Sequence, residues 1–171
     1  MPNDAYSAAI KEAYASAPTD LVIIDTLEIS HPDLPGQSIW LTKSLVDYTL
    51  TLEDGVTNQL FSATAFEFKL PAAGENGLQE LSIVIDNVDR RISEFMDTVK
   101  NSREPVKLVY RPYLSTDLTA PQMDPPLSLN ITDIKADVFK VTARATFADL
   151  LNKKHPLQMY TRARFPSLGG S

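Results

Sequence analysis

The chain has 171 residues, of which 43% are hydrophobic and 22% are charged, and its net charge is −6. These values are typical of one globular domain with a sizeable core. The acidic balance argues against binding to a nucleic-acid backbone, which needs a basic surface. The absence of cysteine excludes disulfides, thiolate metal sites and a cysteine nucleophile, and twelve prolines favour turns over a helical bundle.

No apolar run approaches the roughly 20 residues that span a bilayer. The N-terminus lacks the basic region and the apolar core of a signal peptide. We therefore expect the protein to be made in the cytoplasm and to have no membrane association.

The chain begins with a predicted helix over residues 4–17. Asn3 or Asp4 can cap its N-terminus, alanines supply helix propensity, and Pro18 ends it. One face carries apolar and aromatic side chains, namely Tyr6, Ile10, Ala13, Tyr14 and Ala17. We expect this helix to dock on a surface, either its own or a neighbour's.

Several strands follow the helix. Apolar patterning predicts strands over residues 20–30, 38–41 and 47–52, separated by turn sequences. A further extended segment covers residues 59–70, and residues 71–77 have the composition of a loop.

Residues 79–114 have the pattern strand, helix, strand. Alternating apolar residues predict a strand over 79–88, and apolar residues at helical spacing predict a helix over 89–99. Asp86 is placed to cap this helix, with Asp89 in its first turn. Alternation resumes over residues 106–114.

The last third of the chain begins with a proline-rich connection over residues 115–126. Strands over residues 127–133 and 137–147 are expected to close the core. Five side chains of the second strand are predicted to face inward, namely Phe139, Val141, Ala143, Ala145 and Phe147.

The predicted fold is mainly β with minor α, a β-sandwich or a partly closed barrel, with one helix inserted between strands and an N-terminal helix. The organisation is a docking helix over residues 1–19, a β-rich domain over 20–150 and an irregular tail over 151–171.

Candidate catalytic residues are few. His31 and His155 lie beside prolines in polar loops, without a matching nucleophile or carboxylate, and are expected to be exposed to solvent. Asp86 and Asp89 could bind a cation, but helix capping is the favoured interpretation. No phosphate-binding loop, dinucleotide turn or zinc-protease motif occurs. We expect no enzymatic activity, no cofactor and no metal site.

Aromatic and basic residues offer two further interpretations. Trp40 with Tyr110 and Tyr113 could form a platform that stacks on sugars, although packing in a core or an interface is favoured for alternating strand positions. Arg162 and Arg164 could contact nucleic acid, but in an aromatic-flanked tail they are better suited to clamping a neighbouring subunit.

The order of elements carries a resemblance to a known family. A strand opens at Phe66 and is followed by the segments 81–88, 92–99, 106–114 and 129–143. This order resembles the N-terminal domain of minor tail protein L of lambda-like long-tailed phages, and is similar to uncharacterised phage and prophage proteins of this size. The resemblance covers about residues 5–164 and rests on apolar patterns and on Asn87. That family also has a cysteine-rich C-terminal part that holds an iron–sulfur cluster. Because this chain has no cysteine, the resemblance implies no such cluster here.

The resemblance implies a structural virion protein of a siphophage tail tip or baseplate, in a ring or hub that joins the tail tube to the central fibre protein. The implied partners are copies of the chain itself in a trimer or hexamer, the distal tail protein and the central fibre or hub protein. DNA would pass through the lumen without specific binding. Interface roles are expected for Tyr6, Ile10, Tyr14, Tyr160, Arg162, Arg164 and Phe165.

A carbohydrate-binding β-sandwich module is the alternative. It would use Trp40 and the tyrosines to stack on sugar rings.

Overall fold

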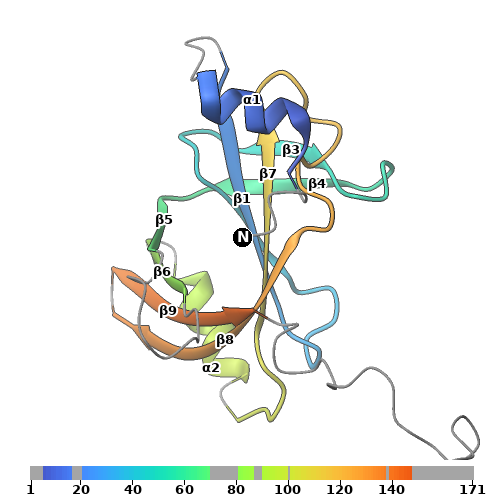
Figure 1. The fold of residues 1–171 in the computed structure, drawn as a ribbon. Coiled ribbons are helices and arrows are strands. Elements are labelled where there is room, and N and C mark those ends of the chain that lie inside the picture. The colour runs from blue at the N-terminus through green and yellow to red at the C-terminus, as the bar shows by residue number, and fades with distance from the viewer. Residues whose placement is uncertain are drawn as a thin grey trace, which may run out of the picture.

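The structure is a computed structural model that describes residues 6–16, 21–69, 81–86, 90–99, 101–137 and 139–147. These residues form nine strands and two short helices, one near the N-terminus and one inserted between strands (Figure 1). The predicted class, mainly β with minor α, is confirmed. Neither described helix is long and apolar enough to cross a membrane.

The helices and strands lie close to their predicted positions. They are, in chain order, α1 Ala8–Ser16, β1 Ile23–Ser30, β2 Ile39–Thr42, β3 Tyr48–Thr51, β4 Asn58–Ala63, β5 Phe66–Lys69, β6 Leu81–Asp86, α2 Arg91–Val99, β7 Lys107–Leu114, β8 Leu127–Ala136 and β9 Lys140–Phe147.

All nine strands belong to one sheet with the order β3-β4-β2-β1-β7-β8-β9-β6-β5. Every pairing is antiparallel except that of β2 with β4. The long strands β1 and β7 run side by side along the molecule, with α1 and the β3–β4 hairpin towards one end and β6, β9 and α2 towards the other (Figure 1).

The predicted segment 59–70 is two strands on opposite sides of the sheet. At the bend between β4 and β5, Thr64 N donates to Thr42 O at 2.9 Å and Asp86 N donates to Ala65 O at 2.9 Å. The chain therefore leaves the β2 side and joins the β6 side within two residues. This crossing bends the sheet so that β2 and β5 contribute side chains to one core, yet no described strand pairing closes it into a full barrel.

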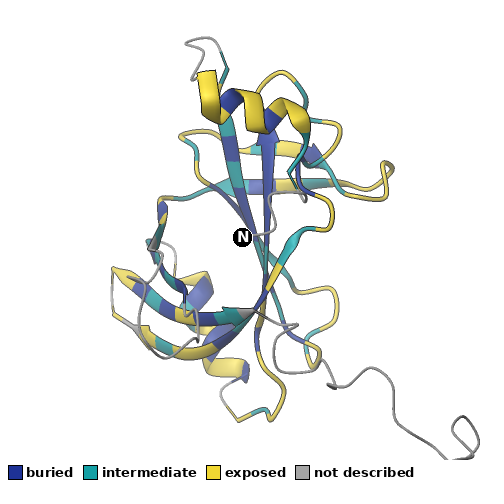
Figure 2. Ribbon diagram, in the orientation of Figure 1, coloured by how far each residue is buried: buried dark blue, intermediate teal, exposed yellow. Residues whose placement is uncertain are grey.

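The two faces of β1 and β7 serve different cores. Leu27 and Leu108 belong to the main core, which also contains side chains of β2, β5, β6, β8, β9 and α2. Ile24 and Tyr113 lie on the opposite face, in a smaller core with Leu50 and Phe61 of the hairpin. Buried residues consequently run along both long strands, as Figure 2 shows.

Helix α2 packs as its periodicity predicts. Its four buried side chains, which recur at helical spacing, are Ile92, Phe95, Met96 and Val99. The expectation that Asp86 caps this helix is wrong, because Asp86 is the last residue of β6 and the helix begins only at Arg91. Asp89 lies outside the described residues.

Two further corrections concern the end of the sheet. Phe139 is 73% exposed, because it precedes the first residue of β9 and lies in the β8–β9 turn, whereas Val141, Ala143 and Ala145 are buried as predicted. The side chain of Phe147 and the tail over 151–171 lie outside the described part of the structure.

Candidate interaction surfaces

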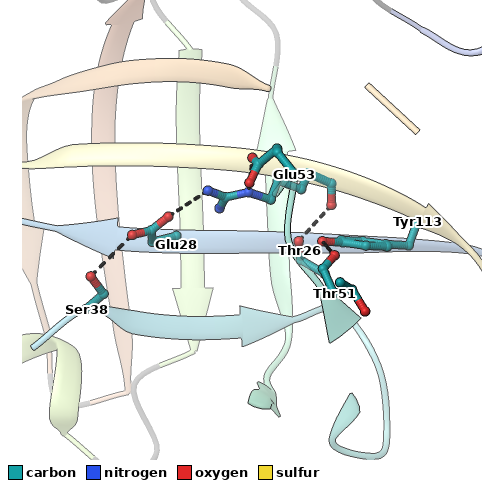
Figure 3. Close-up of polar contacts among 7 residues, drawn as sticks. Thr26, Glu28, Ser38, Thr51, Glu53 and Tyr113 are labelled. Atoms are coloured by element: carbon teal, nitrogen blue, oxygen red, sulfur yellow. Dashed lines mark hydrogen bonds and ion pairs between the residues drawn. The ribbon is translucent and has the colours of Figure 1, made fainter. Parts of the chain in front are cut away.

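A buried cation joins the hairpin to the long strands. Arg111 of β7 is only 6% exposed, and its Nη2 lies 2.9 Å from Oε2 of Glu28 in β1. Its Nε lies 2.5 Å from Oε1 of Glu53, in the β3–β4 turn, and its guanidinium stands 5.5 Å from the centre of the Trp40 ring. Figure 3 shows both carboxylates pointing toward this guanidinium, with Ser38 beside Glu28. Because Glu28 and Glu53 already neutralise the Arg111 guanidinium, this cluster stabilises the packing of the hairpin on the long strands and is not an anion-binding site.

Two hydroxyl groups reinforce the same junction (Figure 3). Thr26 Oγ1 donates to the backbone oxygen of Arg111 at 2.7 Å, and Tyr113 Oη donates to the backbone oxygen of Thr51 at 2.8 Å. Burial raises the pKa of the Tyr113 phenol. The Tyr113 phenol is neutral and fully buried, and its hydroxyl donates to a backbone carbonyl. It therefore stabilises the position of the hairpin and is not available to a ligand.

The predicted face of α1 docks on its own chain. Ile10 is fully buried against Leu114 and Ala13, and therefore attaches α1 to the body. Tyr14 is 59% exposed and its ring meets that of half-buried Tyr6 edge-on, with centroids 6.3 Å apart. Tyr6 lies before α1 and forms a β-bridge with Met123, so the helix begins later than the predicted residue 4. Of the three interface residues predicted for the N-terminal helix, Tyr14 is the one that remains largely open to a partner.

A second tyrosine interaction lies between α1 and the main core. Tyr110 Oη donates to Oδ1 of Asp25 at 2.7 Å. Burial first, and the Asp25 carboxylate second, raise the pKa of Tyr110 well above its usual range. Tyr110 therefore keeps its proton at neutral pH and acts as a hydrogen-bond donor to Asp25.

The sequence predicted that His31 is exposed to solvent, but this side chain is buried, with an exposed fraction of 3%. Asp33 N donates to its Nδ1 at 3.1 Å, so the proton resides on Nε2, which donates to the backbone oxygen of Glu104 at 3.0 Å. The imidazole thus joins the turn after β1 to the segment before β7. Both ring nitrogens are engaged, which leaves neither free to act as a base. His155 lies outside the described residues.

The aromatic side chains considered for sugar stacking are packed in the cores. Tyr113 is fully buried, Tyr110 is 8% exposed, and Trp40 packs edge-on against Phe61 with ring centroids 5.3 Å apart. The core-packing interpretation is confirmed for Tyr110 and Tyr113, whereas partly buried Trp40 packs against the smaller core. Across the described part of the chain, no group of three histidine, aspartate or glutamate side chains is arranged to hold a metal ion.

The β3–β4 hairpin and its approach carry an exposed surface that the sequence did not reveal. Its exposed apolar side chains are Leu45, Val46, Val56 and Leu60, with exposed fractions of 100%, 57%, 78% and 54%. The segment 44–66 contains no lysine, arginine or histidine, but has the carboxylates Asp47, Glu53 and Asp54. We call residues 44–60 the hairpin surface. The sequence feature that could have indicated this surface is the presence of an apolar residue, Val56, in a turn.

Two hollows lie elsewhere on the body. One of about 480 Å³ lies beside β5, where Lys43, Glu67, Asp86 and Lys140 give it mixed charge. The other, of about 390 Å³, lies between α2 and β8 and includes Met96. We assign neither hollow a chemical role.

Tyr160, Arg162, Arg164 and Phe165, the remaining predicted interface residues, lie outside the described residues. A comparison with curated proteins finds no match. Residues 9–160 match the family described as "Domain of unknown function (DUF1833)". Because this match covers most of the chain, the protein belongs to that family.

Proposed function

We propose that this protein is a structural component of the tail tip or baseplate of a long-tailed phage. In this role, copies of the chain form part of the ring or hub that joins the tail tube to the central fibre protein. The distal tail protein and the central fibre protein are its neighbours, and DNA passes through the lumen without specific binding. It is made in the host cytoplasm and resides in the virion.

The resemblance to minor tail protein L is one support for this proposal. The segments that carry the resemblance correspond to β5, β6, α2, β7, β8 and β9, which contribute side chains to a single core. The likeness in sequence pattern thus follows the part of the chain that forms the main structural unit.

The hairpin surface is the observation that carries the proposal furthest. Four of the large apolar side chains that are exposed to solvent lie within residues 44–60, on the hairpin and its approach, and β3 is an edge of the sheet. Clustered exposed apolar side chains and open strand edges are features of surfaces that another protein covers. The polar groups Arg111, His31 and Tyr110, by contrast, are used in internal contacts.

Labelled particles test this proposal. The chain would carry an epitope tag in the parent phage, and purified particles would be stained with a gold-conjugated antibody and imaged by electron microscopy. Gold at the end of the tail distal to the head is the expected result, with an untagged phage as the control. Purified infectious particles that lack the chain would contradict the proposal.

A further inference from the structure

The charge of this chain is divided unevenly between its body and its last residues. Residues 148–171 contain Lys153, Lys154, Arg162, Arg164 and one acid, Asp149, a net charge of +3. Residues 1–147 therefore carry −9 of the total of −6. Such a division favours contact between the basic segment and an acidic surface.

Within the basic segment, one stretch has the pattern of a strand. Residues 157–165 alternate between the row Leu157, Met159, Thr161, Ala163 and Phe165 and the row Gln158, Tyr160, Arg162 and Arg164. Prolines stand directly before and after this stretch, at positions 156 and 166. A short alternating segment bounded by prolines is suited to adding a strand to an exposed sheet edge.

The hairpin surface offers a matching acceptor. It exposes apolar side chains together with Asp47, Glu53 and Asp54, in a segment without a cation. The Asp54 carboxyl accepts hydrogen bonds from Thr57, which lower its pKa. Arg111 neutralises part of the Glu53 charge. Asp47 and Asp54 are therefore the two carboxylates of the hairpin surface that form no ion pair with a described cation.

The outer edge of β3 is open at its centre. Thr51 N donates outward to Leu118 O at 3.1 Å, which covers one end of the strand. In an antiparallel pair, outward and inward backbone groups alternate, so the backbone of Thr49 also points outward. No backbone hydrogen bond from another described segment reaches it.

We propose that residues 157–165 of one copy bind the hairpin surface of a second copy and add a strand along β3. The last described residue lies towards the end of β7 opposite to the one on which the hairpin packs. Phe147 pairs with Leu129, which pairs with Leu108 near the start of β7, whereas the hairpin packs on Tyr113 near the end of β7. A contact that joins opposite ends of successive subunits is heterologous, and such contacts generate rings when the rotation closes. This inference deepens the proposed function by defining how copies join.

Engineered cysteines test the contact directly, since the chain has none of its own. Full-length T49C and T161C would be mixed and oxidised, with M159C and A163C covering neighbouring registers. One of the alternating tail positions should yield a disulfide-linked heterodimer with T49C. T132C, at an exposed position on β8, is the matched control in place of T49C and should yield at least tenfold less.

Charge reversal provides the second measurement, by sedimentation velocity on the full chain over a range of concentrations. D47K/D54K and R162E/R164E should each weaken self-association about tenfold, and an equimolar mixture of the two variants should associate more tightly than either alone. Circular dichroism would establish that both variants are folded.

Three results would overturn the inference: no heterodimer above the T132C control, association that does not respond to either reversal, or a disulfide formed only within one chain in T49C/T161C. The last would place the segment on its own hairpin. Because these measurements use purified protein, a negative result would contradict this contact between copies without contradicting the tail-tip role, which is tested by the presence of the chain in phage particles.

Discussion

Removal of the Arg111 cation provides the sharpest test of the described architecture. In R111M, the methionine retains an unbranched apolar stem beside Trp40 but leaves Glu28 and Glu53 without their cation. The side chain of Glu28 is 14% exposed and that of Glu53 is 34% exposed. Removing one member of a buried ion pair typically costs about 3–5 kcal/mol. Since Glu53 can regain water, we expect the free energy of unfolding to fall by about 3 kcal/mol, the lower end of that range.

Urea denaturation followed by tryptophan fluorescence suits this measurement, because Trp40 is the only tryptophan and lies beside Arg111. A loss of about 3 kcal/mol lowers the melting temperature of a domain of this size by about 6–12 °C. The double variant E28Q/R111M removes both charges of the more buried pair, and should recover about 2 kcal/mol of the loss.

Two results would refute this reasoning. A loss below about 1 kcal/mol in R111M would mean that the guanidinium does not stabilise the junction. Strict additivity of the losses in E28Q and R111M would mean that the two side chains are not coupled.

Three further predictions address individual side chains. Burial raises the pKa of both Tyr110 and Tyr113, so their protonated forms stabilise the fold fully below about pH 10, and this stability is lost as pH rises through their folded-state pKa. Phenolate absorbance at 295 nm from these two side chains should therefore appear only together with unfolding. Ionisation of either phenol without loss of the circular dichroism signal would contradict this prediction. Ile10→Ala should cost about 2–4 kcal/mol and speed proteolysis near α1, while Tyr14→Ala, at an exposed position, should cost less than about 0.5 kcal/mol; equal losses in thermal unfolding would count against the docking of α1. His31→Ala should cost about 1–3 kcal/mol by urea denaturation, because Glu104 O and Asp33 N lose their partner, and an unchanged midpoint would show that the ring is not buried.

Local periodicity was sufficient for much of the fold. Helix α2 could be predicted because Ile92, Phe95, Met96 and Val99 recur at helical spacing within nine residues. The buried rows of β6 and β9 were likewise visible as alternation. Phe139 has the same parity as Val141, but it precedes the strand, and parity has no meaning beyond the end of a strand.

The remaining features depend on contacts between distant segments. The bend at Thr64 and Ala65 is set by separate pairings with β2 and β6, which no local pattern encodes. His31 forms a hydrogen bond with the backbone oxygen of Glu104, which is 73 residues away in the sequence. Arg111 pairs with the carboxylate of Glu53, which is 58 residues away. The hairpin surface escaped notice because its exposed apolar residues resemble core residues until the sheet order places β3 at an edge.

The most direct test of the tail-tip proposal is deletion of the gene from the parent phage or prophage, with lysates examined by negative-stain electron microscopy. The proposal predicts DNA-filled heads without finished tails, and restoration of complete particles by the gene supplied in trans. Normal, infectious particles from the deletion strain would contradict it.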